Sequence, residues 1–439
     1  MASTLVQWIY YLDDPHLVAK FQRACGIRSS ASFDARSGTH SNHGVDNNAP
    51  NGSDISSKSN GLVESSMVNG SDNTLKRRDH AHDNSTENNN NAGDTSGATK
   101  KAELQYSIDN KCLYWLFTFG AGLGNSTFYT LFFSVCVWSF DSFVLRKTLL
   151  MWIVIMYVGQ VAKDIIKWPR PRSPPAIRLE ERYGLEYGMP STHAMVGFVL
   201  PFGMLFYMCG RYEQLSCSPQ FSLLFGLLIA VSWCLLVCSS RIYLGMHSAL
   251  DVIAGVLFAA VLMSITAPFV DPVDRFLISH PLSTPVLVLT CVALGLMYPR
   301  VEKWSTTRAD TMLSLGVFSG IYQGLWLIRK MSDSRPAPET LPLSLSVPSH
   351  VDIGLLLLRQ LIGVPFISLF AVVTKLIILH LFSWCLRCNP NDRETKRRLE
   401  IPYRYGGFFV AASVGLYLPQ IIFSALNLDR VALLSETFS

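Results

Sequence analysis

The chain has 439 residues, 49% of them hydrophobic, and a formal net charge of +5 at pH 7. So small a charge on so long a chain gives no reason to expect binding to nucleic acid. Its ten cysteines are scattered, and several fall in or beside apolar runs, which indicates small buried hydrophobic residues rather than a disulfide framework. Because the N-terminal quarter is very polar, the mean hydropathy of +0.26 requires the remainder to be strongly apolar, as in a polytopic membrane protein.

Residues 1–25 are predicted to form a short amphipathic helix that docks on the body of the protein or lies on the membrane surface. Asp14 and Pro15 suit the N-cap and first position of a helix. The apolar residues that follow share one helical face: Leu17, Val18, Phe21 and Ala24. No basic segment precedes the first apolar run, which is unlike a cleavable signal peptide.

Residues 26–105 are dominated by Ser, Asn, Asp and Gly and contain a single aromatic residue, Phe33. Such a segment cannot bury enough apolar surface to offset the entropy of ordering, so we predict a disordered polar tail. Three glycan acceptor sequons begin at Asn51, Asn69 and Asn84, and they would be used only if the tail faces the lumen.

From about Leu113 the chain becomes a series of apolar runs, and we predict an all-α, polytopic membrane bundle of about nine transmembrane helices. The predicted spans are 114–138, 144–165, 193–209, 220–239, 249–269, 283–299, 310–328, 354–384 and 405–427. Small residues in the first and seventh spans, such as Gly120, Gly124, Gly316 and Gly320, are interpreted as sites of close helix packing.

Three polar blocks stand at the ends of these runs. The third block holds Ser240, Arg241, His247 and Asp251. On a helix, the spacing of four stacks His247 and Asp251 on one face, where the carboxylate can fix one imidazole nitrogen and leave the other free as a nucleophile. A surface His–Asp pair is the simpler alternative, but the nearby Arg241 favours the first interpretation because its guanidinium can bind two oxygens of a phosphate.

The second block, Pro190-Ser191-Thr192-His193, precedes a span. Ser191 or Thr192 can cap the following helix, whose N-terminus would favour a bound anion. His193 would then stand beside that anion and could protonate a departing alkoxide. The alternative is a simple helix cap with an incidental histidine.

The first block carries Lys163 and Arg170 on either side of Trp168-Pro169. These cations could hold a phosphate, although a lysine at the end of a span is often only an interfacial anchor.

Together the blocks resemble the signature of the type 2 phosphatidic acid phosphatase superfamily. The pattern is Lys-x6-Arg-Pro, Pro-Ser-x-His and Ser-Arg-x5-His-x3-Asp. One departure is Thr192, because glycine usually stands there and lets the backbone approach the phosphate. The Pro-Ser-Thr-His form, the Asp14-Pro15-His16 opening and the long polar tail resemble the sphingosine-1-phosphate phosphatase branch.

The resemblance implies a phosphatase-type transmembrane catalytic core at 106–270, followed by additional transmembrane helices at 271–439. It implies hydrolysis of sphingosine-1-phosphate in the endoplasmic reticulum membrane, with His247 as nucleophile, Asp251 as its orienting group and His193 as general acid and base. Lys163, Arg170, Ser191, Thr192 and Arg241 would bind the phosphate. No carboxylate cluster of the two-metal kind accompanies the blocks, so we expect neither metal nor cofactor.

Two questions stay open at the level of sequence. A lipid phosphotransferase of the same fold, or a transporter or receptor that has lost catalysis, would carry much of the same pattern. The membrane face of the site is also open, because the Lys and Arg residues of the short loops favour the cytosol whereas the related lipid phosphatases generally use the lumenal or extracellular face.

Overall fold

The computed structural model describes most of the chain after Met1. Left undescribed are residues 30–105, 181–183, 210, 214–218, 300–305, 332–342, 345–348, 393–394, 396–397, 431 and 439. The predicted disordered tail therefore lies almost entirely outside the described residues, as do the three sequons. Within the described part the fold is helical, and strands occur only as two short pairs. The predicted all-α class is confirmed.

The N-terminal residues form two helices, α1 (Ala2–Asp13) and α2 (Pro15–Ala24), where one is predicted. The break falls at Asp14, whose side chain accepts a hydrogen bond from the His16 N–H and caps α2 as expected. On α2 the predicted face is only partly correct, because Val18 is buried but Ala24 is exposed.

A buried glutamine fixes α2 to the rest of the molecule. The Gln22 amide donates to the carbonyls of Ile177 and Tyr243 at 2.6 and 2.9 Å, and its oxygen accepts from the Ile177 N–H. Strand β1 (Ile27–Ser29), which lies within the predicted disordered range, pairs antiparallel with β2 (Tyr106–Ile108). Residues 27–29 and 106–108, on either side of the undescribed segment, therefore form one short ribbon.

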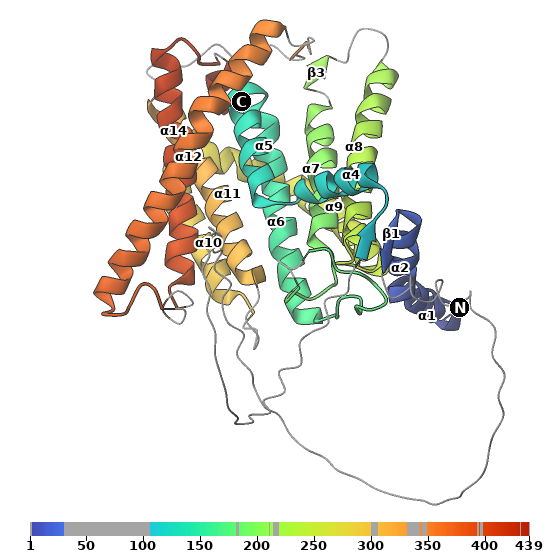
Figure 1. Cartoon of the computed structure of the whole chain (residues 1–439). Coiled ribbons are helices and arrows are strands. Elements are labelled where there is room, and N and C mark those ends of the chain that lie inside the picture. Colours follow the sequence, from blue (N-terminus) through green and yellow to red (C-terminus); the bar gives the residue numbers. More distant parts are fainter. Residues whose placement is uncertain are drawn as a thin grey trace, which may run out of the picture. The chain divides into compact units, whose positions relative to one another are not determined.

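The first predicted span, 114–138, is wrong as a single helix. The chain forms α4 (Lys111–Gly122), then turns and continues as α5 (Ser126–Ser139). Asn125 stands at the N-cap of α5 with extended backbone, so the turn over residues 123–125 ends one helix and starts the other. In Figure 1, α4 lies across the bundle whereas α5 runs along it.

The other predicted spans each correspond to a helix. These are α6 (Ser142–Ile166), α7 (Thr192–Met208), α8 (Pro219–Tyr243), α9 (Ala249–Ser279), α10 (Ser283–Met297), α11 (Thr306–Met331), α12 (His350–Cys385) and α14 (Gly407–Ala425) with the π-helical turn η2 (Ile401–Gly406) before it. A short helix, α15 (Ala432–Phe438), follows, and strands β3 (Tyr212–Glu213) and β4 (Leu343–Ser344) pair in parallel.

Six helices among the described residues are long and apolar enough to cross a membrane, and three shorter apolar helices cover 128–139, 192–208 and 283–297. The protein is therefore a multi-pass membrane protein, but the predicted count of nine spans is not confirmed. Helix α9 has 31 residues, longer than the predicted 249–269, and carries Pro268 and Pro272 in its interior.

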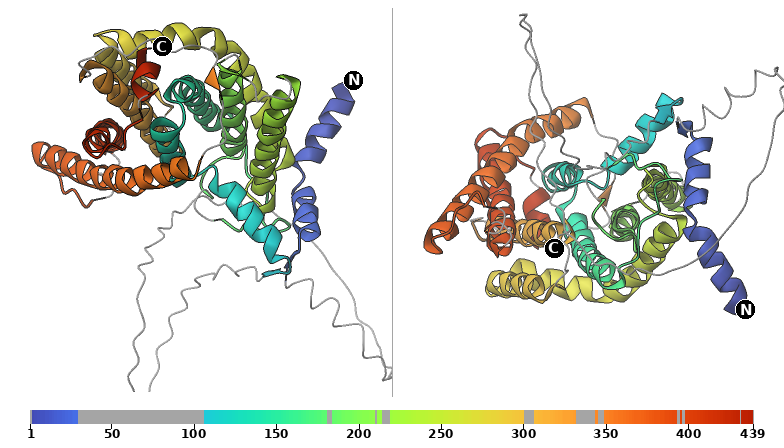
Figure 2. Two further views of the ribbon diagram at one scale, coloured as in Figure 1. Left: turned by 90° about the horizontal axis from the view of Figure 1, so that it is seen from above. Right: turned by 60° about the horizontal axis from the view of Figure 1, so that its bottom comes forward.

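Helix α6 lies inside the bundle and packs against α7, α9 and α11. Helices α12 and α14 stand on one side of it, and α4, α8 and the N-terminal helices on the other (Figures 1 and 2). Close packing of α11 on α14 depends on glycine, as predicted, because a Cβ at Gly320 would lie 2.5 Å from the Phe409 carbonyl oxygen.

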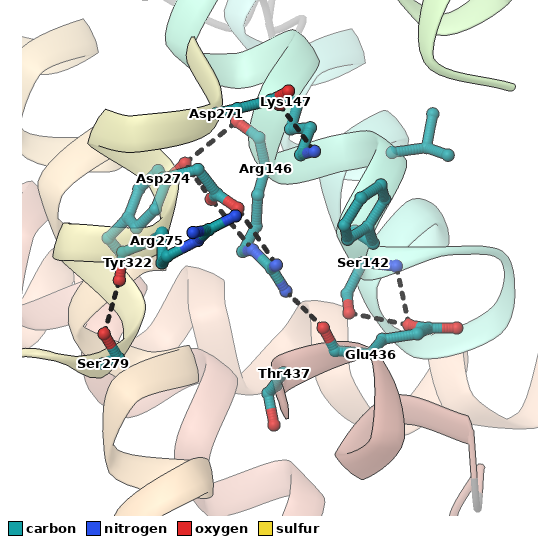
Figure 3. Close-up of polar contacts among 12 residues, drawn as sticks. Ser142, Arg146, Lys147, Asp271, Asp274, Arg275, Ser279, Tyr322, Glu436 and Thr437 are labelled. Carbon is teal, nitrogen blue, oxygen red and sulfur yellow. Dashed lines mark hydrogen bonds and ion pairs between the residues drawn. The ribbon is translucent and has the colours of Figure 1, made fainter. Parts of the chain in front are cut away.

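A buried polar network joins the start of α6 to α9, α11 and α15 (Figure 3). The Arg146 guanidinium donates to both carboxylate oxygens of Asp274, at 3.0 and 3.1 Å, and to the Glu436 carbonyl at 2.8 Å. Tyr322 donates to Asp274 at 2.8 Å, and Glu436 accepts from the backbone and hydroxyl of Ser142. The network holds the last helix against the core.

Breaking this network should destabilise the protein. We expect Asp274→Asn to lower the free energy of unfolding by about 3–5 kcal/mol, since it leaves Arg146 buried without its counter-charge. The matched control is Asp271→Asn, whose carboxylate pairs with Lys147 but is 62% exposed, so it should cost at most about 1 kcal/mol. Thermal unfolding in detergent measures both variants, and equal midpoints for the two would contradict the assignment.

Candidate active site

The three polar blocks meet at one end of the bundle. Lys163 is in the last turn of α6, Arg241 in the last turn of α8, and Ser191 and Asp251 stand at the starts of α7 and α9. The Ser191 N–H donates to the Asp251 carbonyl at 3.1 Å, which joins the second block directly to the third. Residues about sixty positions apart in the sequence therefore share one site.

A glycine on α9 permits this junction. A Cβ at Gly255 would lie 2.7 Å from the Ser191 carbonyl oxygen, so only glycine lets the first turns of α7 and α9 approach so closely. Ser191 caps α7, with its hydroxyl accepting from the Ala194 N–H at 3.5 Å, as the sequence predicts. The free N–H groups of the α7 N-terminus consequently face the site.

His247 and Asp251 are paired, but not on one helical face as predicted. Helix α9 begins at Ala249, so His247 precedes it. Asp251 instead forms a capping box with Ser248: its Oδ2 accepts from the Ser248 N–H at 2.9 Å, and the Ser248 hydroxyl accepts from the Asp251 N–H at 3.2 Å. The same Oδ2 lies 3.5 Å from His247 Nδ1. The cap, which the Ser-x-x-Asp spacing could have revealed, is what orients the carboxylate.

The other ring nitrogen of His247 faces Arg170. Nε2 lies 3.2 Å from Arg170 Nη1, which also donates to the Met246 carbonyl at 2.7 Å. Because a guanidinium can only donate, this contact requires Nε2 to carry the lone pair and places the proton on Nδ1, toward Asp251. Burial, followed by the positive charges of Arg170, Arg241 and Lys163, lowers the pKa of His247 well below its ordinary value. The imidazole is therefore neutral near pH 7.

Lys163 and Arg170 contact a carboxylate that the sequence analysis did not single out. Lys163 donates to Thr192 Oγ1 at 3.3 Å and to Glu186 Oε2 at 3.2 Å, and Arg170 Nη2 lies 3.7 Å from the same oxygen. Burial alone would raise the pKa of Glu186, but Lys163, the Thr306 hydroxyl and Arg170 hold it below its ordinary value, so the group is ionised. Only its place between the first two blocks could have suggested it.

Arg241 is 1% exposed and only partly paired. Its Nη1 donates to Glu180 Oε2 at 3.0 Å, whereas Nε and Nη2 have no hydrogen-bond partner among the described residues. Buried donors of this kind are rare in folded proteins and generally serve a bound group. A phosphate oxygen is the acceptor that fits a guanidinium edge.

His193 follows Thr192 in the first turn of α7 and borders a small polar cavity of about 60 Å³. Gly124, in the turn between α4 and α5, lies against its ring, and a Cβ there would collide with the imidazole. This glycine was interpreted as a helix-packing site, but its contact is with a candidate catalytic side chain. The charge of His193 also influences the pKa of His247, so the two rings share one electrostatic environment.

All eight predicted site residues thus belong to one cation-rich cluster, most of it buried. It offers three cationic side chains, a helix N-terminus and a neutral imidazole whose unprotonated nitrogen faces Arg170. Such a cluster has the groups needed to bind a dianionic phosphate and present a nitrogen nucleophile to it.

Comparison with known proteins agrees with this chemistry. Residues 145–274, which include all three blocks, match the PAP2 superfamily. Sphingosine-1-phosphate phosphatase 1 of Rattus norvegicus is 36% identical over 326 residues, covering 73% of this chain and 74% of the relative. Sphingosine-1-phosphate phosphatase 2 of Homo sapiens is 34% identical over 413 residues, covering 92% of this chain and 94% of the relative.

Sphingosine-1-phosphate phosphatase 2 of Mus musculus is 37% identical over 320 residues, covering 71% of this chain and 86% of the relative. No solved structure matches the chain. Similarity of this level over most of both sequences, together with the three blocks that meet in one cluster, shows that the chain belongs to the sphingosine-1-phosphate phosphatase family of the PAP2 superfamily.

Proposed function

We propose that this membrane protein hydrolyses sphingosine-1-phosphate and related sphingoid base phosphates to the free base and inorganic phosphate. The family supports a lipid phosphate phosphatase, and the names of its relatives support this substrate. The observation that carries the proposal is the orientation of His247, with Nδ1 toward Asp251 and Nε2 toward the cations. We place the protein in the endoplasmic reticulum membrane by resemblance to the same branch.

Phosphate binding would fall to the three cations and the start of α7. Arg241 can use its unpartnered Nε and Nη2, and Arg170 can turn Nη1 from His247 to a phosphate oxygen. Lys163 and Thr192 already contact each other and would hold a second oxygen. Ser191 contributes as the cap of α7, because it fixes the helix N-terminus whose N–H groups favour an anion.

In the first chemical step His247 Nε2 attacks phosphorus. An N–P bond forms while the bond from phosphorus to the ester oxygen breaks, and His193 gives a proton to the departing alkoxide. Asp251, which the Ser248 cap holds in place, stabilises the positive charge that develops on the imidazole. Lys163, Arg170 and Arg241 stabilise the non-bridging oxygens as charge spreads over them in the transition state.

In the second step water attacks the phosphohistidine. His193, now neutral, takes a proton from that water, the N–P bond breaks, and inorganic phosphate leaves with His247 restored. Positive charge from three side chains supplies the stabilisation that a metal ion provides in two-metal phosphatases. The reaction as proposed therefore needs no metal.

The direct test is phosphate release by the purified full chain from sphingosine-1-phosphate, phosphatidate, lysophosphatidate and glucose-6-phosphate. We expect release from the sphingoid substrate, abolished in His247→Ala and retained in EDTA. Transfer of phosphate to an added alcohol without free phosphate would favour the phosphotransferase. Unchanged turnover in His247→Ala would rule out the mechanism, and loss in EDTA with recovery on adding magnesium would rule out its metal-free form.

His193→Ala separates the two histidines. We expect the rate with sphingosine-1-phosphate to fall about a hundredfold or more, because the alkoxide loses its proton donor. A substrate with a good leaving group, such as p-nitrophenyl phosphate, needs no acid and should still phosphorylate His247. Acid-labile phosphoprotein measured after a rapid quench reports this step. The matched control is His380→Ala, an exposed histidine outside the site, and normal turnover in His193→Ala would remove that residue from the acid role.

Glu186 balances two of the cations, so its removal should strengthen anion binding. We expect Glu186→Gln to be inhibited by inorganic phosphate at a concentration several-fold lower than wild type, because Lys163 and Arg170 lose their counter-charge. Inhibition constants for phosphate measure the effect. Glu180→Gln is the comparison, since its pairing is with Arg241 and its side chain is 22% exposed, so the change should be smaller. An unchanged or weaker phosphate affinity in Glu186→Gln would contradict this charge balance.

A further inference from the structure

The small cavity beside His193 is lined by acceptors as well as by the histidine. Glu186, Asp310 and the amide of Gln160 all border it. Gln160 is only 4% exposed, and its Oε1 has no hydrogen-bond partner among the described residues. A buried amide oxygen without a donor at the wall of a cavity indicates a bound donor, independently of the two carboxylates.

An apolar cavity adjoins this one. Tyr129, Leu313 and Ser314 line both the polar cavity and a larger cavity of about 320 Å³. Side chains from α5, α11, α12 and α14, such as Phe133, Val317, Ile367 and Leu416, form the walls of the larger space. A hydrocarbon chain fits such walls, so the two cavities together suit an amphiphile with its polar end at His193.

The chemistry of the proposed substrate indicates which polar group lies beside His193. A sphingoid base phosphate carries an ammonium on the carbon next to the one that bears the ester oxygen. That nitrogen and the ester oxygen are separated by three bonds and lie on the order of 3 Å apart. If His193 protonates the ester oxygen, the ammonium must lie in the space around His193, which is the cavity bordered by Gln160 and Asp310.

We propose that Asp310, with Gln160 Oε1, binds the substrate ammonium and makes the enzyme select amine-bearing phosphates, while the alkyl chain lies in the larger apolar cavity. Glu186 borders the same cavity, where its oxygens contact Lys163, Arg170 and Thr306. Asp310 lies in the first turns of α11, outside the residues that match the superfamily. This inference rests on the proposed function, because it takes His193 as the acid and a sphingoid base as the leaving group.

The test compares dihydrosphingosine-1-phosphate with octadecyl phosphate, which has the same chain length but no ammonium. A charge-assisted contact is worth about ten- to a hundredfold in kcat/KM. We expect wild type to prefer the amine by about that factor. Asp310→Asn, an isosteric change, should lose most of the preference, with kcat/KM for octadecyl phosphate changed less than about threefold.

The matched control is Asp271→Asn, near the end of α9 that is remote from Asp251. This variant should keep the preference for the amine substrate. Asp310→Glu, which keeps the charge, should recover part of it. If Asp310 only supported the fold or positioned His193, both substrates would lose rate together and the ratio would stay constant, which overturns the proposal. If Asp310→Asn does not fold, Gln160→Met provides the same comparison, with an expected loss of about three- to tenfold on the amine substrate alone.

The outcomes separate this inference from the proposed function. No phosphate release from either substrate by wild type would defeat the proposed function itself. Release from both at equal rates would leave the phosphatase standing and overturn amine recognition. Inhibition by the products gives a second reading, because dihydrosphingosine should inhibit wild type more strongly than octadecanol does, and this difference should disappear in Asp310→Asn.

Discussion

The rest of the site depends on three buried cations at one end of the bundle. Lys163, Arg170 and Arg241 are each at most 8% exposed, and placing positive charge there without compensation would be costly. Two carboxylates from the connection between α6 and α7 provide the balance, Glu186 for the first two cations and Glu180 for the third. The compensation is incomplete at Arg241, where two donors have no partner among the described residues. The carboxylates therefore offset part of the positive charge, and the remainder favours a bound dianion.

The same positive charge also affects His247. Burial first, and then the charge of Arg170, Arg241 and Lys163, lowers the pKa of His247, which keeps the ring neutral, and Arg170 selects the tautomer by approaching Nε2. Asp251 completes the arrangement through a structural role, because its capping bond with Ser248 fixes the carboxylate before any substrate binds. The helix cap and the proposed orientation of His247 thus depend on one side chain. A substitution of Asp251 would thus affect both the start of α9 and the tautomer of His247.

Much of this site could be predicted from sequence because its chemistry lies in short blocks with fixed spacing. Ser191 as a helix cap follows from local rules about helix ends, and the grouping of the cations was implied by the resemblance of the three blocks to a family signature. The predicted relation between His247 and Asp251 was wrong. The spacing of four was interpreted as helical, but His247 precedes α9, and the capping box at its start places Asp251 beside the ring. Glu186 and Gln160 could not be found in this way, because their importance comes from long-range packing that no local pattern encodes. The break between α4 and α5 was missed for a related reason: the apolar run is continuous through Leu123, and the contact of Gly124 with His193, which leaves no room for a Cβ, is a long-range one.

The proposed role of the helices outside the superfamily match can be understood from the nature of the substrate. A recess that recognises phosphate cannot by itself distinguish one phosphomonoester from another, since the phosphate group is common to all of them. Selectivity has to come from surfaces beyond the ester oxygen, and in our proposal those surfaces belong mainly to α5, α11, α12 and α14, with Trp152 of α6 beside them. The polar cavity lies at the boundary, with Gln160, Thr192 and His193 from the matched region and Gly124, Tyr129 and Asp310 from outside it. In this arrangement the matched region, residues 145–274, supplies the reaction, and the helices outside it select the alcohol. The two regions meet around the ester bond that breaks.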